Sequence, residues 1–65
     1  MMQNKVREER GKKGLTQQQL AEQVGVSRQT INAIEAGNYV PSTLLALKLS
    51  QVFEVPVNAF FFLTQ

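Results

Sequence analysis

Hydrophobic residues recur at helical spacing in two short segments near the middle of the chain. In the first segment, Leu20, Ala21 and Val24 form one apolar stripe. In the second, Ile31 and Ile34 point in the same direction. A glycine follows each stripe, as is typical of a helix that ends in left-handed backbone conformation. The pattern therefore predicts two short helices.

Polar residues ahead of each stripe mark where these helices begin. Thr16 can cap the first helix with its hydroxyl, and Gln19, three residues further on, completes a capping box. Ser27 is the corresponding cap of the second helix. We therefore predict two helices over about residues 16–37, joined by a tight turn at Gly25.

The second helix carries hydrogen-bonding side chains on the face away from its isoleucines, where Arg28, Gln29 and Asn32 lie. Arginine can contact guanine O6 and N7 in bidentate fashion, and glutamine or asparagine can contact adenine N6 and N7. Such a face suits the major groove of DNA. The alternative interpretation is an ordinary polar face in a small helical bundle.

Four residues of the two helices follow an order of small residue, glycine, apolar and apolar: Ala21, Gly25, Ile31 and Ile34. The segment that contains them, LTQQQLAEQVGVSRQTINAIEAG, resembles the Cro/C1-type family of bacterial and phage repressors. The similarity extends from about Val6 to Leu63. The resemblance implies an all-α fold, a compact five-helix lambda-repressor-like DNA-binding domain that comprises residues 1–65. Its helix-turn-helix motif covers about residues 16–37.

The resemblance also implies which residues contact DNA. The amide and side chain of Gln17 would anchor on a phosphate at a helix start. Arg28 and Gln29 would read base edges, Asn32 would lie deeper along the helix, and Ala33 would contact a thymine methyl. The full set of expected DNA-binding residues is Gln17, Ser27, Arg28, Gln29, Asn32, Ala33, Asn38 and Tyr39.

Asn38 and Tyr39 follow the second of these helices, which corresponds to the recognition helix of the family. Family members place contacts to phosphates in the segment after this helix. Such loop contacts position a protein on DNA and carry little sequence information. The ring of Tyr39 can alternatively pack over the edge of the core.

The first helix is expected over about Gln3–Lys13, and its apolar stripe is thin because it runs onto the charged residues Glu9 and Arg10. In the family, an arginine at the place of Arg10 pairs with the glutamate that ends the recognition helix, here Glu35. We take this pair as structural, because a desolvated ion pair holds orientation more reliably than it adds stability.

The C-terminal part predicts two further helices, over about Thr43–Phe53 and within EVPVNAFFFLTQ, where Pro56 fits a first turn. Leu44 and Leu47 make the former apolar nearly all round, so it requires cover on more than one side. On the last helix, Val57, Phe60 and Phe61 face inward, and Ala59, Phe62 and Leu63 face outward. We expect this outward patch to be a dimer interface, since a twofold axis can place two recognition helices one DNA turn apart. The alternative is a frayed C-terminus onto which Phe62 packs back.

Composition adds limits to this interpretation. The net charge of +2 is concentrated near the N-terminus, where residues 1–13 carry five basic and two acidic side chains. These cations can lie along phosphates, although Lys12 and Lys13 can equally form a solvated helix face. The chain has 65 residues, no cysteine and no apolar run of about 20 residues, so we expect one small cytoplasmic domain without a membrane span.

The leading hypothesis is therefore a sequence-specific regulator of transcription, a repressor that binds double-stranded DNA at a palindromic operator as a homodimer. A second is a protein–protein adaptor or antitoxin-like module with the same fold. An enzyme is excluded as a working hypothesis: histidine and cysteine are absent, and Glu8 and Glu9 point about 100 degrees apart on a helix. We expect no cofactor, no metal and no small-molecule substrate, since neither a phosphate-binding glycine loop nor metal-ligand spacing occurs.

Overall fold

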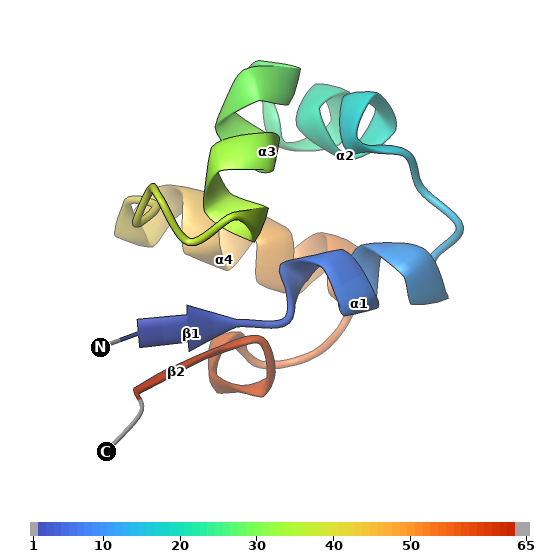
Figure 1. Ribbon diagram of the computed structural model, residues 1–65. Coiled ribbons are helices and arrows are strands. Elements are labelled where there is room, and N and C mark those ends of the chain that lie inside the picture. The colour runs from blue at the N-terminus through green and yellow to red at the C-terminus, as the bar shows by residue number, and fades with distance from the viewer. Residues whose placement is uncertain (1, 64–65) are drawn as a thin grey trace.

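The computed structural model describes residues 2–63, which form four short α-helices, one 3-10 helical turn and a two-stranded antiparallel sheet (Figure 1). In chain order the elements are β1 (Met2–Asn4), α1 (Val6–Lys12), α2 (Gln17–Val24), α3 (Arg28–Glu35), α4 (Thr43–Phe53), η1 (Val57–Ala59) and β2 (Phe61–Leu63). In Figure 1, α4 crosses the middle of the molecule, with α2 and α3 on one side of it and the two strands on the other. No helix within residues 2–63 is both long enough and apolar enough to cross a lipid bilayer.

The predicted beginnings and ends of α2 and α3 are confirmed. The Thr16 hydroxyl accepts a hydrogen bond from the Gln19 amide at 3.0 Å, and the Gln19 side chain accepts one from the Thr16 amide at 2.9 Å. Ser27 caps α3 by accepting from the Thr30 amide. Gly25 has a φ of 77°, and this left-handed turn lets α3 cross α2 directly.

The expectation of a first helix from Gln3 is wrong, because Met2–Asn4 is a strand paired with Phe61–Leu63. The helix starts at Val6 instead. Asn4 separates strand from helix: its side-chain oxygen accepts a hydrogen bond from the Val6 amide at 3.2 Å, which satisfies a free amide at the helix start.

The expectation of a fifth α-helix is also wrong, and the fold is mostly helical rather than all-α. Pro56 has a ψ of 154°, which is extended, and only the single 3-10 turn η1 follows before β2 begins. Strand pairing offers the backbone of Phe61–Leu63 hydrogen bonds with β1, and aromatic residues suit a strand. The last residues of the expected helix, 64–65, lie outside the described residues.

The core lies between the helices and the inner side of this small sheet. Phe60 and Phe61 are buried as predicted, and Phe60 meets Phe53 of α4 edge to face, with ring centroids 5.1 Å apart. Val57 is only half-buried at the edge of the core. The buried hydrophobic residues are Val6, Leu20, Ala21, Val24, Ile31, Ile34, Leu45, Leu49, Phe53, Phe60 and Phe61.

Candidate nucleic-acid interface

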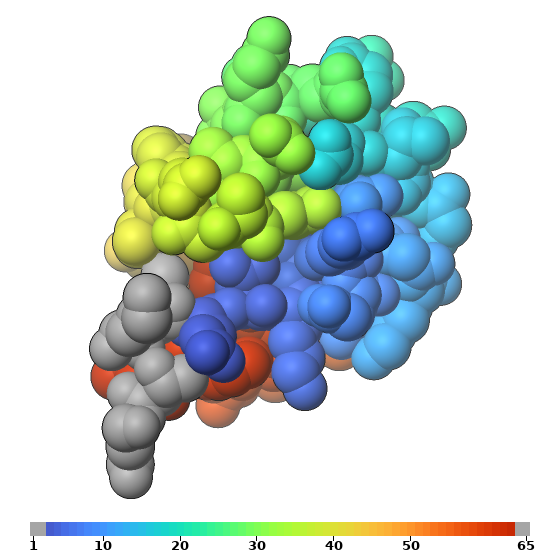
Figure 2. Space-filling model, in the orientation of Figure 1, coloured from blue at the N-terminus to red at the C-terminus, as the bar shows by residue number. Residues whose placement is uncertain are grey.

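The exposed side of α3 is the candidate reading surface. Ile31 and Ile34 are fully buried on one side of the helix, while Arg28, Gln29 and Asn32 are exposed and together line a shallow pocket of about 150 Å³. Figure 2 shows α3, in green, standing out at one end of the molecule beside α2. The residues predicted to read bases are therefore brought together on one accessible helix face.

Other predicted contact residues border this surface. Ala33 is half-buried, and Ser27 is exposed but uses its hydroxyl to cap α3. Asn38 and Tyr39 are exposed in the loop after α3. The Asn38 backbone amide donates to the Ala33 carbonyl at 2.9 Å and so closes the helix end. A contact of Asn38 with phosphate is thereby left to its side chain.

Arg10 of α1 and Glu35 at the end of α3 meet in an ion pair. The Arg10 Nε donates to Glu35 Oε2 at 2.7 Å, and Nη2 donates to Oε1 at 3.1 Å. The Arg10 Nη1 also donates to the Leu15 carbonyl at 2.9 Å, in the connection before α2. The hydrogen bond to Glu35 raises the pKa of Arg10 above its ordinary value, while partial burial acts in the opposite direction. One guanidinium therefore joins three parts of the chain around the base of α3.

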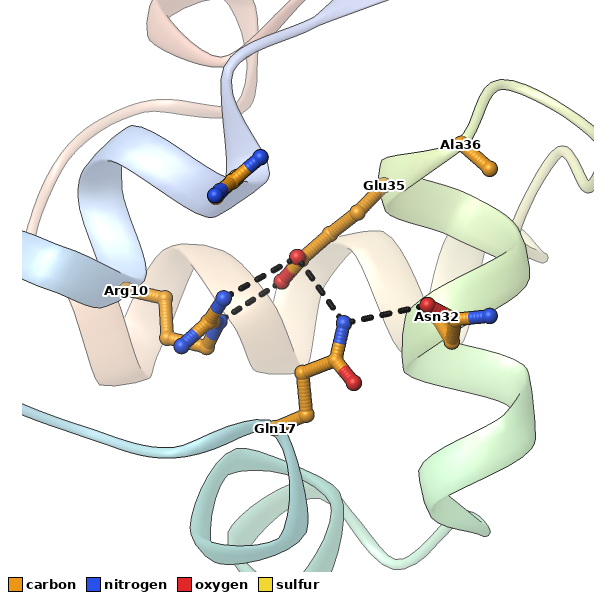
Figure 3. Close-up of a pocket in the computed structure, with 6 residues that line it drawn as sticks. Arg10, Gln17, Asn32, Glu35 and Ala36 are labelled. Carbon is orange, nitrogen blue, oxygen red and sulfur yellow. Dashed lines mark hydrogen bonds and ion pairs between the residues drawn. The ribbon is translucent and has the colours of Figure 1, made fainter.

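Gln17, the first residue of α2, extends this cluster (Figure 3). Its side-chain nitrogen donates to Asn32 Oδ1 at 3.3 Å and to Glu35 Oε1 at 3.2 Å. Within residues 2–63, the backbone amide of Gln17 has no hydrogen-bond acceptor and is the part of this residue open to an anion at the helix start.

The sequence analysis assigned no individual role to two further residues near this surface. Arg7 lines a pocket of about 380 Å³ together with Arg10, Gln17, Asn32, Glu35 and Ala36. Its position three residues before Arg10 on a helix is a signal that could have placed it on the same face. Asn4 donates from its side-chain nitrogen to the Ile34 carbonyl at 2.9 Å and holds the end of α3, a contact without a local sequence signal.

The N-terminal cations are divided by their contacts. Lys12 pairs with Glu9 at 3.0 Å, and Lys13 pairs with Glu54. Arg28 forms neither an ion pair nor a side-chain hydrogen bond within residues 2–63. Positive charge open to a phosphate or a base at this surface thus comes from Arg28 and Arg7 rather than from the paired lysines.

Similarity to known proteins agrees with this geometry. Residues 6–60 match the helix-turn-helix family. The chain is 50% identical over 64 residues to YgzD, an uncharacterised HTH-type transcriptional regulator of Bacillus subtilis strain 168. The aligned region covers 98% of this chain and 97% of YgzD. The chain is also 48% identical over 60 residues to MJ0272, an uncharacterised HTH-type transcriptional regulator of Methanocaldococcus jannaschii. The aligned region covers 92% of this chain and 91% of MJ0272.

Solved structures share the fold. The crystal structure of a protein from Bacteroides fragilis that is named a putative DNA-binding protein has a TM-score of 0.85 and 27% identity, over 95% of this chain and 100% of that one. A chain from the complex of SinR with SinI has a TM-score of 0.76 and 31% identity, over 83% of this chain and 53% of that one. The chain belongs to the helix-turn-helix family of Cro/C1-type transcriptional regulators, a class of DNA-binding proteins and not of enzymes.

Replacing Arg10 by methionine should lower the free energy of unfolding by about 2 to 3 kcal/mol, because Glu35, whose side chain is 6% exposed, loses its charged partner. Urea denaturation measures this change. Lys13→Met is the matched control, since it breaks the pair of Lys13 with the exposed Glu54 and should leave the midpoint nearly unchanged. Equal destabilisation by both variants would contradict a special role for Arg10.

Proposed function

We propose that this protein is a sequence-specific transcriptional repressor that binds a palindromic operator as a homodimer and reads each half-site with α3. One observation carries the proposal: Arg28, Gln29 and Asn32 are exposed side by side on a helix whose opposite face is buried in the core. A helix mounted in this way can enter the major groove without rearrangement of the fold.

The chemistry of α3 suits base recognition. Arg28 lies at the first position of the helix and has no partner among the described residues, so its guanidinium can reach guanine O6 and N7. Gln29 can pair with adenine, and Ala33 offers a methyl group to thymine. Ser27 lies next to these residues, at the cap of α3. Each contact involves a side chain already directed away from the core.

Phosphate contacts would fix the position of this helix on the duplex. The Gln17 amide at the start of α2 is the anchor best supported by the structure, and the exposed Asn38 and Tyr39 can add contacts beyond the other end of α3. Few cations are available, so each protomer alone should bind DNA modestly. This is a reason for two protomers to act together.

The proposed dimer contact includes Ala59, Phe62 and Leu63. Leu63 is 79% exposed, and the alternation of a strand places it on the same face as Phe61. Phe62 points to the opposite face of the strand, so these residues do not share the single outward face expected of a helix. Phe61 lines an apolar groove of about 230 Å³, and none of the described residues that line it is charged. The other lining residues of this groove are Val40, Pro41, Thr43, Ala46, Leu47 and Val57. A second copy that covers the patch would remove apolar surface from water on both protomers.

The same groove favours a second candidate function, a protein–protein adaptor or antitoxin-like module. Leu47, which lines the groove, is 54% exposed, and a chain similar to this one was solved in a complex of two different proteins, SinR and SinI. The two functions differ in their response to salt. Binding to random duplex DNA should weaken steeply between 50 and 200 mM salt for a DNA reader, on the order of several-fold or more, whereas an adaptor should show almost no binding.

Alanine at Arg28 or Gln29 should cost about 1 to 3 kcal/mol at one base pair of the operator and relax the base preference there. Fluorescence anisotropy with a duplex selected from a random library, and with its single-base variants, measures this cost. Gln51→Ala is a matched control, because Gln51 is exposed on α4 outside the reading surface. If the Arg28 and Gln29 variants lost the same affinity for every sequence, these residues would contact phosphates only.

Serine at Leu63 should shift the protein from dimer to monomer at micromolar concentration, because the contact loses apolar surface. Sedimentation equilibrium measures the change. Leu44→Ser is the control, since Leu44 is 64% exposed but lies on α4 and not on the strand that carries Leu63. Dissociation of the Leu44 variant with an intact Leu63 variant would place the interface elsewhere.

A further inference from the structure

Four polar side chains from three helices form one chain of hydrogen bonds at the edge of the reading surface. Arg10 of α1 donates to Glu35, Gln17 of α2 also donates to Glu35, and the same Gln17 nitrogen donates to Asn32. Figure 3 shows the side chain of Gln17 between Glu35 and Asn32, with dashed lines to both. The order of these contacts determines how each amide group is turned.

The orientation of the Gln17 side-chain amide follows from its charged neighbour, Glu35. A carboxylate only accepts hydrogen bonds and a guanidinium only donates them, so Glu35, paired with Arg10, requires the amino end of the Gln17 amide. That amino group has two hydrogens. The nitrogen lies 3.2 Å from Glu35 Oε1 and 3.3 Å from Asn32 Oδ1, so each hydrogen can serve one of these two acceptors.

The turn of the Asn32 amide follows in the same way. Facing an amino group, Asn32 must present its oxygen to Gln17, and its own amino group then points away, as Figure 3 shows. Asn32 is exposed beside Arg28 and Gln29, so its amino group is the polar atom directed to a ligand of this surface. Without Gln17, an exposed asparagine could offer either end.

We propose that Gln17 is a specificity-determining positioning residue, which holds Asn32 as a hydrogen-bond donor and so selects a base with an acceptor edge. Guanine, with O6 and N7, and thymine, with O4, present acceptors and no donor to this amino group, whereas adenine places its N6 amino donor beside its N7 acceptor. Bidentate recognition of adenine needs the oxygen and the nitrogen of one amide together, and Gln17 holds the Asn32 oxygen turned away. This inference rests on the proposed function, since it concerns the base read by Asn32.

Selection of bound duplexes from a random library tests the proposal. Asn32→Ala identifies the relevant base pair, because the preference at that position should vanish. At this position the wild-type protein should favour guanine or thymine over adenine about fivefold or more. Gln17→Met, which cannot donate a hydrogen bond, should reduce that ratio to within about twofold.

Two further variants separate orientation from stability. Gln18→Met is the matched control: Gln18 is the neighbouring glutamine, but its side chain bonds Glu22, so the preference should not change. Gln17→Lys keeps a donor toward Glu35 and Asn32 and should retain the wild-type preference even if total affinity changes. Thermal unfolding of each variant verifies that it is folded under the binding conditions.

A wild-type preference for adenine at the Asn32 position, or an unchanged preference in Gln17→Met, would overturn the proposal. If Asn32→Ala weakened binding to all sequences alike, Asn32 would contact phosphate. The proposal would then fail while the proposed function stood. Absence of any sequence preference in the wild-type protein would overturn both.

Discussion

The ion pair of Arg10 with Glu35 is the contact on which the reading surface depends. Glu35 ends α3, Arg10 lies on α1, and the same guanidinium reaches the Leu15 carbonyl before α2. A buried carboxylate without a cation is costly, so any arrangement that separates these two residues is strongly disfavoured. The pair therefore holds the end of α3 against α1 and against the connection that precedes α2.

The opposite end of α3 is held by different means. Ser27 caps the first turn of α3, and the left-handed conformation at Gly25 brings α2 directly against α3. Ile31 and Ile34 of α3 are buried in the core. With both ends held, α3 has one exposed face and little freedom to change it. Gln17 bonds both Glu35 and Asn32 and so links the Arg10–Glu35 ion pair to the reading surface. The ion pair therefore also affects the orientation of the Asn32 side-chain amide.

Much of this arrangement could be predicted from the sequence because its signals are local. The caps at Thr16 and Ser27 and the glycine turn each involve residues within a few positions of one another. The pairing of Met2–Asn4 with Phe61–Leu63 joins opposite ends of the chain, and a phenylalanine run fits a helix stripe as well as a strand. The orientation of the Gln17 side chain could not be predicted either, because it depends on the Glu35 carboxylate, 18 residues away in the sequence, and not on neighbouring residues.

The account reduces to the claim that DNA meets the protein at the exposed face of α3. Backbone amide chemical shifts of the 15N-labelled protein, recorded during titration with a duplex selected by the protein, test it most directly. We predict the largest shift changes at residues 28–33 and at Gln17, with small changes on α4. Changes confined to the groove between residues 40–47 and Phe61, with α3 unaffected, would contradict the claim.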